Sequence, residues 1–378
     1  LPFGTYRVAE TQAPRGYLLN ETVWEVAVER DGETVGVGEA PGNPGTDEAM
    51  PRGSDQDPPT LFDTMASAFA PAVALADEGQ GIAVQATVPE QVVRGGVSVQ
   101  KVDGETGLPS PQGGATLAGT EFSIVSLNKR PVVVGGTSYG EGETVMTIVS
   151  GEDGVAASGP DDLPFGTYLV REAAAPEGYR EANGFEQTFT VSEDGEVVAL
   201  DRPFSDEPVR GGLSVRKVDA DTGASEPLAD GTLLGTRFAV VNANEHPVVV
   251  GSESFGPGEV VLTLTTDETG YAATGGRDLP FGTYTVAEAL PPEGYTPGDG
   301  SIWTVRIEED GVVVLCDAAF ANRIARGDLA GTKVEDASGS AMPGVAFLVT
   351  SLTTGERHVL VADGDGRFAT SASQAPHT

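Results

Sequence analysis

The chain repeats itself at a fixed interval of 116 residues, and this period limits the folds open to it. The segment Arg-Gly-Gly-Val-Ser-Val-Gln-Lys ends at Lys101. A close copy ends at Lys217, and a more diverged one ends at Lys333. An interval of this length is the size of one ordinary domain. The sequence therefore predicts a tandem array of domains joined end to end.

A second repeated motif, Leu-Pro-Phe-Gly-Thr followed by Tyr-x-Val-x-Glu, begins at Leu1, Leu163 and Leu279. The first two copies lie 162 residues apart, 46 more than the period, so we expect a flexible insertion at about residues 38–80. We read Leu-Pro-Phe-Gly-Thr as the turn into the following strand. The chain then divides into the C-terminal part of a first repeat (1–94), complete repeats at 95–210 and 211–326, and the N-terminal part of a fourth (327–378).

Within each unit the sequence has the pattern of short β-strands. Runs such as residues 144–149 and 260–265 are rich in β-branched side chains and are separated by Asp-Gly, Thr-Gly and Gly-Gly turns. The 51 glycines and 26 prolines suit a fold with many turns. Since no useful stretch of helical periodicity appears, we predict an all-β fold of tandem immunoglobulin-like antiparallel β-sandwich domains.

Composition excludes several classes of function. A formal net charge of −35 repels nucleic acid and anionic membranes. One cysteine, Cys316, excludes a disulfide framework and a cysteine-based zinc site, and three scattered histidines suit neither a metal cluster nor a catalytic triad. No apolar run is long enough for a transmembrane helix. We expect no cofactor, no metal, no nucleic-acid partner and no membrane span in this segment.

A lysine occupies a strand position that should be apolar. With a side-chain period of two, Val97, Val99 and Lys101 share one face, and the same alternation places Lys217 on the core face of the next unit. Three of the four lysines in the chain stand at this repeat position, whereas 18 arginines supply the other cationic groups. Because a buried lysine can lose its proton and an arginine cannot, the bias indicates a neutral amine with a chemical role.

A glutamate recurs among aromatic and aliphatic neighbours. Tyr168, Val170 and Glu172 share one strand face, and Glu10 and Glu288 hold the same place in their units. Burial raises the free energy of an unpaired carboxylate, so we expect these glutamates to titrate toward their neutral form.

A third polar position lies four residues before the Arg-Gly segment that opens each unit. It holds Asp206 in one complete unit and Asn322 in the other. A neutral amine is a nucleophile, and a protonated glutamic acid polarises a neighbouring carbonyl and shuttles protons. The expected product is an amide bond between side chains, with loss of water from Asp or ammonia from Asn. The alternative is a buried Lys–Glu–Asp ion network without a covalent bond.

These residues resemble the Cna B-type, or SpaA-like prealbumin-fold, domains of Gram-positive pilins and surface adhesins. Residues 6–17 look like the E-box of the major pilins, and residues 168–179 and 284–295 repeat it. The resemblance covers nearly the whole chain outside the insertion. It implies a prealbumin-like sandwich in which a first-strand lysine joins an Asn or Asp near the last strand, with the E-box glutamate as catalyst. Carried over by position, the sets are Lys101–Glu172–Asp206 and Lys217–Glu288–Asn322.

The two partial units depart from this pattern. The first keeps Glu10 but has Glu90 at the acceptor position, where the extra methylene changes the reach. The fourth keeps Lys333, and we expect it to stay unlinked in this chain.

The expected function is a structural, pilin-like stalk of a cell-wall-attached extracellular protein, non-enzymatic apart from cross-linking itself. Its partners are then the neighbouring repeats of the same chain. One alternative is an adhesin whose domains bind a host surface or matrix ligand, with the insertion as the candidate region. Another is a transthyretin-like carrier, which predicts no cross-link.

Overall fold

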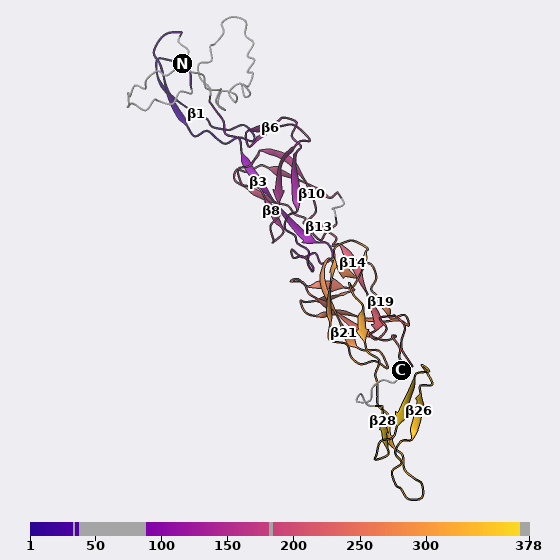
Figure 1. Ribbon diagram of the computed structural model, residues 1–378. Coiled ribbons are helices and arrows are strands. Elements are labelled where there is room, and N and C mark those ends of the chain that lie inside the picture. Colours follow the sequence, from indigo (N-terminus) through magenta and orange to yellow (C-terminus); the bar gives the residue numbers. More distant parts are fainter. Residues whose placement is uncertain (33–34, 38–87, 181–183, 371–378) are drawn as a thin grey trace, which may run out of the picture.

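The computed structural model describes residues 1–32, 35–37, 88–180 and 184–370. Every regular element in these ranges is a strand, from β1 (Gly4–Ala9) to β28 (Arg367–Ala369), and none of the described residues form a helix that could cross a membrane. Figure 1 shows the units following one another along one long axis, with β1 toward one end and β28 toward the other. The all-β prediction is confirmed, whereas the insertion at about 38–80 falls outside the described residues.

The second unit packs two sheets around one core. Its strands are β3 (Arg94–Asp103), β4 (Glu121–Ser126), β5 (Val132–Val134), β6 (Thr137–Tyr139), β7 (Thr144–Val149), β8 (Val155–Ala157), β9 (Leu163–Pro164), β10 (Gly166–Ala174), β11 (Glu186–Val191), β12 (Val197–Ala199) and β13 (Phe204–Asp206). One sheet is antiparallel in the order β11-β10-β4-β7. The other is built on β3, which pairs with β8, β9, β12 and β13, and β5–β6 form a separate hairpin.

The third unit repeats this plan. Its strands are β14 (Arg210–Asp219), β15 (Arg237–Asn242), β16 (Val248–Val250), β17 (Glu253–Phe255), β18 (Val260–Thr265), β19 (Tyr271–Ala273), β20 (Leu279–Pro280), β21 (Gly282–Leu290), β22 (Ile302–Ile307), β23 (Val313–Leu315) and β24 (Phe320–Asn322). One sheet has the order β18-β15-β21-β22, and the other is built on β14. The Leu-Pro pairs of the repeated motif form the short strands β9 and β20, and its glycines already open β10 and β21, so only the phenylalanine lies at the turn into the glutamate strand.

The first strand of each complete unit runs parallel to the last, which is a departure from a purely antiparallel sandwich. Phe204 of β13 lies opposite Lys101 of β3, and Phe320 of β24 lies opposite Lys217 of β14. Because the two strands run in the same direction, the chain enters a complete unit at one end and leaves it at the other. This topology explains the linear arrangement in Figure 1.

Alternation along the strands builds the two cores. In the second unit Val97, Val99, Tyr168 and Val170 are buried in a cluster that draws on both sheets. The third unit has the equivalent cluster around Tyr284, which is fully buried. Each of these tyrosines sits deep in a core and donates its hydroxyl to the backbone oxygen of a proline four residues earlier in the chain. The aromatic ring is thereby buried with its polar atom satisfied.

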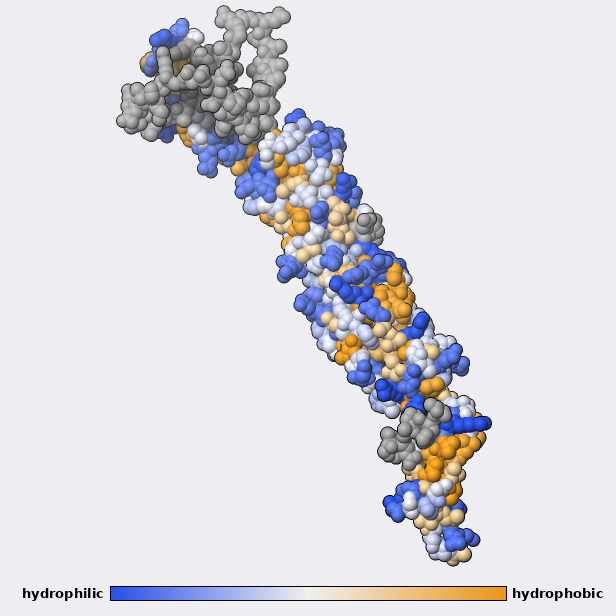
Figure 2. Space-filling view, in the orientation of Figure 1, coloured by the Kyte–Doolittle hydropathy of each residue, from blue (hydrophilic) through white to orange (hydrophobic). Residues whose placement is uncertain are grey.

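The described parts of the first and fourth units are smaller. In the first, β1 pairs with β2 (Val23–Val28). In the fourth, β25 (Ala330–Thr332) pairs with β28, and β26 (Ala346–Thr350) pairs with β27 (Arg357–Val361). Large apolar side chains stay exposed on the fourth unit, including Leu348 and Val361, and Figure 2 shows hydrophobic residues gathered at this end of the molecule.

Candidate functional site

The first candidate site lies between the first and last strands of the second unit. Lys101 follows Val97 and Val99 along the inner face of β3, and its side chain is fully buried. Its ammonium nitrogen lies 3.2 Å from Oδ2 of Asp206, a residue of β13 whose side chain is also fully buried. The strand alternation that places a valine in the core two residues earlier places this lysine there too.

Glu172 of β10 completes this site. Both of its carboxyl oxygens are buried, and neither has a hydrogen-bond partner. A β-bulge between Glu172 and Ala174 interrupts the pairing of β10 with β4, and bulges of this kind redirect a side chain beside a site. Burial, and after it the neighbouring Asp206, raises the pKa of Glu172 to about 8. Glu172 is therefore mostly protonated at neutral pH and able to donate a proton to its neighbours.

The ring of Tyr179 closes the other side of the Lys101 ammonium, whose nitrogen lies 5.7 Å from the ring centre. The Tyr179 hydroxyl donates to Oδ2 of Asp103 over 2.9 Å, and Asp103 is itself fully buried. We did not single out Asp103 as a site residue from the sequence. The signal was present, because an aspartate stands two residues after the lysine in both complete units, as Asp103 and Asp219.

The second candidate site has the same place in the third unit. Lys217 of β14 is fully buried, and its ammonium donates to the backbone oxygens of Phe320 over 2.8 Å and Val218 over 3.2 Å. It lies 3.9 Å from Oε2 of Glu288. Burial lowers the pKa of Lys217 to about 8, despite the opposing charges of Glu288 and Asp219. A sizeable fraction of this lysine is thus a neutral amine near physiological pH.

Asn322 of β24 stands where Asp206 stands in the second unit. Its side-chain amide donates to Oε1 of Glu288 over 2.9 Å, and the backbone N–H of Gly298 donates to the same oxygen over 3.2 Å. Oδ1 of Asn322 and Oε2 of Glu288 are buried without hydrogen-bond partners. The structure therefore brings Lys217, Glu288 and Asn322 into one cluster, in which an amine and a carboxamide both contact the glutamate.

The described part of the first unit brings two carboxyl groups together. Glu10 accepts a hydrogen bond from the backbone of Asn20 over 2.7 Å. Glu90 lies close to Glu10, and burial and then the charge of Glu10 raise the pKa of Glu90. No lysine occurs in the sequence before Lys101.

In the fourth unit Lys333 is half-buried. Its backbone pairs with Gly366 and Met342, and no acidic partner of its ammonium occurs in the described part of that unit. The two partial units thus hold separate members of the set, without a complete one. Among the described residues no group of three His, Cys, Asp or Glu side chains could hold a metal ion.

These two buried clusters, repeated in prealbumin-like sandwiches, define a class of domain. A sequence model of the SpaA family, described as a prealbumin-like fold domain, matches residues 1–39, 95–202 and 211–318, more than half of the chain. The chain belongs to this family, and the resemblance found in its E-box segments is confirmed. No curated protein matches the chain significantly.

Several solved structures are similar to this chain. The Bacillus anthracis TIE protein is 22% identical, with 74% of this chain and 44% of that chain covered and a TM-score of 0.44. The minor pilin GBS52 of Streptococcus agalactiae is 18% identical, with 62% and 97% covered and a TM-score of 0.26. The shaft pilin SpaA of Lactobacillus rhamnosus GG is 15% identical, with 62% and 99% covered and a TM-score of 0.23. The chain spans less than half of the TIE structure.

Proposed function

We propose that this chain is a segment of a structural, pilin-like stalk on the surface of a Gram-positive cell, and that its two complete units cross-link themselves. The observation that carries the proposal is the pair Lys101–Asp206, 3.2 Å apart with neither side chain exposed, beside a glutamic acid that keeps its proton at neutral pH. An ordinary ion pair lies at the protein surface, whereas both side chains of this pair are fully buried. A buried pair held next to a proton donor is arranged for condensation.

In the second unit the reaction is a condensation of an amine with a carboxylic acid. A proton passes within the buried ion pair from Nζ of Lys101 to the carboxylate of Asp206. The amine nitrogen then attacks Cγ of Asp206, and Glu172 protonates the oxygen that leaves. The proton lost from Nζ returns to Glu172, so the glutamic acid is regenerated. The product is one secondary amide and one water.

In the third unit the acceptor is a carboxamide, so the leaving group changes. Nζ of Lys217 attacks Cγ of Asn322, the C–N bond of the amide breaks, and ammonia leaves with protons passed through Glu288. The hydrogen bond between Asn322 and Glu288 over 2.9 Å supports this assignment. So does the lowered pKa of Lys217, because only the neutral amine is nucleophilic.

The benefit proposed for the bond is mechanical and proteolytic stability. Each amide would join the first strand to the parallel last strand, so a pull on the two ends of a unit passes through the bond and bypasses the rest of the sandwich. By analogy with a disulfide that closes a loop of about 100 residues, constraint of the unfolded chain contributes about 4–5 kcal/mol.

Intact mass of the purified full chain tests the proposal. We expect a mass below the sequence mass by one water and one ammonia, with both losses assigned by peptide mapping to Lys101–Asp206 and Lys217–Asn322. A mass equal to the sequence mass would leave the buried ion network as the correct description.

A further inference from the structure

Phe165 and Phe281, the phenylalanines of the second and third Leu-Pro-Phe-Gly-Thr motifs, each pack on a glycine of the preceding unit. Phe281 of the third unit is 8% exposed and belongs to a small cluster with Ala115, Leu117 and Tyr179 of the second unit. A Cβ atom placed on Gly178 would lie 2.8 Å from the Phe281 ring. The ring therefore occupies space that exists only because residue 178 has no side chain.

The contact recurs one unit earlier. A Cβ atom on Gly16 would lie 2.7 Å from the ring of Phe165, and the guanidinium of Arg15 lies 5.5 Å from the centre of that ring. Gly16 and Gly178 both have φ of +87°, a conformation that favours glycine independently of the ring. Gly16 and Gly178 therefore each have two roles, forming the turn and receiving the next unit.

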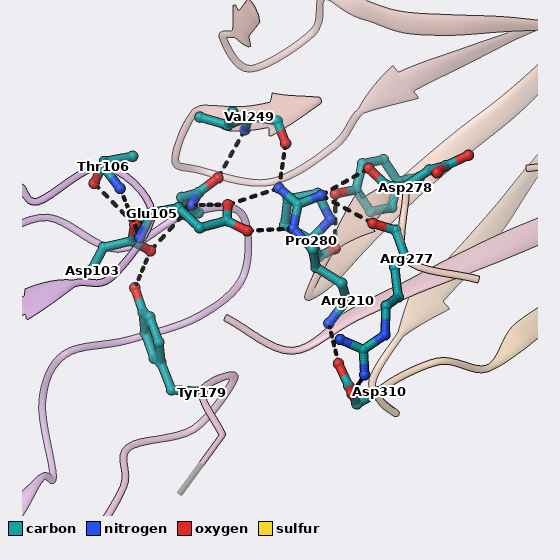
Figure 3. Close-up of polar contacts among 12 residues, drawn as sticks. Asp103, Glu105, Thr106, Tyr179, Arg210, Val249, Arg277, Asp278, Pro280 and Asp310 are labelled. Carbon is teal, nitrogen blue, oxygen red and sulfur yellow. Dashed lines mark hydrogen bonds and ion pairs between the residues drawn. The ribbon is translucent and has the colours of Figure 1, made fainter. Parts of the chain in front are cut away.

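A polar clamp surrounds the contact between the second and third units (Figure 3). Arg210, the first residue of β14, donates to both carboxyl oxygens of Glu105, over 2.6 and 2.8 Å. Its other N–H groups reach the backbone oxygens of Val249, Arg277 and Asp278. The side chains of Arg210 and Glu105 are only 15% and 24% exposed, so this bidentate pair is less screened than an ordinary surface pair.

Backbone groups add to the clamp on the side of the second unit. The amides of Gly113 and Gly114 donate over 3.0 Å to the backbone oxygens of Pro247 and Phe281. Oε1 of Gln112 accepts from the amide of Val249 over 2.8 Å. Contacts of this kind fix the relative orientation of two domains, because a backbone hydrogen bond tolerates little rotation.

We infer that the loop after β3 and the Pro-Glu-Gly-Tyr turn of one unit form a docking surface for the Leu-Pro-Phe turn of the next unit of the same chain, and that this surface holds the second and third units as one rigid body. Domains joined by a linker alone move relative to one another. Here the buried Phe281 ring, the bidentate pair Arg210–Glu105 and the backbone hydrogen bonds together restrict movement between the two units. The inference does not depend on the cross-links.

The chain supplies its own control. Phe3 has the same place in the first unit as Phe281 in the third, and it is 81% exposed in this chain. The ion pair also recurs, since Arg326 contacts Asp221 over 3.0 Å at the repeat-equivalent positions.

The test measures the distance distribution between two spin labels in the full chain. The labels are placed at exposed equivalent positions by Glu152→Cys and Glu268→Cys, in a Cys316→Ala background that removes the buried thiol. We expect one narrow distribution in this parent. Phe281→Ala and Glu105→Ala should each broaden it, and the double variant should widen it about twofold, as expected for a loosened domain pair. Phe3→Ala should leave it unchanged.

A distribution that is already broad in the parent, or one that neither variant broadens, would overturn the inference. Glu105 lies on an outer turn, so Glu105→Ala keeps the test decisive even where Phe281→Ala impairs folding of the third unit. Intact mass of the same samples reports the cross-links independently. Failure of the rigid joint is thus distinguishable from failure of the proposed condensation.

Discussion

The ammonium nitrogen of Lys101 lies 3.2 Å from Oδ2 of Asp206, and both side chains are fully buried in the core of the second unit. In the next unit Lys217 contacts Glu288 and the backbone, while Asn322 donates to Glu288. The two sites thus share their positions in the fold but differ in the acceptor and in its partner. This difference allows each site to be tested against the other.

Each glutamate should be required for the cross-link of its own unit only. We expect Glu172→Gln to restore the mass of one water and Glu288→Gln to restore the mass of one ammonia, because a carboxamide of the same shape cannot shuttle the proton. Intact mass of each variant is the measurement. Glu10→Gln, at the equivalent glutamate of the first unit, is the matched control and should keep both losses. Unchanged losses in the two test variants would remove the glutamates from the mechanism.

The identity of the acceptor should change the leaving group but not the product. Asp206→Asn should release ammonia in place of water and give the same secondary amide. Its cross-linked mass should therefore equal that of the wild-type chain at isotopic resolution. Asn322→Asp should likewise converge on the wild-type mass. An Asp206→Asn variant heavier than wild type by one ammonia, or an Asn322→Asp variant heavier by one water, would show that its unit had not reacted.

Removal of Lys101 from the buried pair with Asp206 should lower the free energy of unfolding even where no cross-link forms. In a Glu172→Gln background, Lys101→Met leaves the Asp206 charge buried without a partner, and we expect a loss of about 3–5 kcal/mol in the free energy of unfolding of the second unit. Hydrogen exchange of the β3 and β10 amides reports that unit. Lys333→Met, at the half-buried equivalent position, should cost less than about 1 kcal/mol. Equal effects would argue that burial of the pair is unimportant.

The stability of an unlinked third unit should rise with pH in the alkaline range. In the Asn322→Ala variant Lys217 has no acceptor, and burial still holds its pKa at about 8, below its ordinary value of 10.5. Between these two pH values the unfolded chain binds more protons than the folded one, so the free energy of unfolding increases with pH and is lowest below pH 8.

Tryptophan fluorescence can follow this transition, because Trp303 is the sole tryptophan once Trp24 is replaced by Phe. Denaturant titrations at several pH values across the window give the slope. A further Lys217→Met replacement should flatten it. A stability that falls between pH 8 and 10.5 would contradict the lowered pKa.

The repeat, the all-β class and the candidate members of both buried clusters could be predicted from the sequence alone. A period of 116 residues aligns three lysines, and the two-residue alternation of a strand predicts Lys101 and Glu172 on core faces. The alternation of side chains along a strand involves only consecutive residues, so the sequence is enough to predict which residues share a face.

Which of these groups meet, and in what geometry, depends on the packing of distant strands. Contacts between residues far apart in the chain produce the parallel pairing of β3 with β13 and the hydrogen bond from Asn322 to Glu288. They also produce the hydrogen bond from Tyr179 to Asp103. The same holds for the joint between units. Gly178 and Phe281 appear in the sequence as parts of two separate turns, and only packing of one unit on the next brings the ring over the glycine.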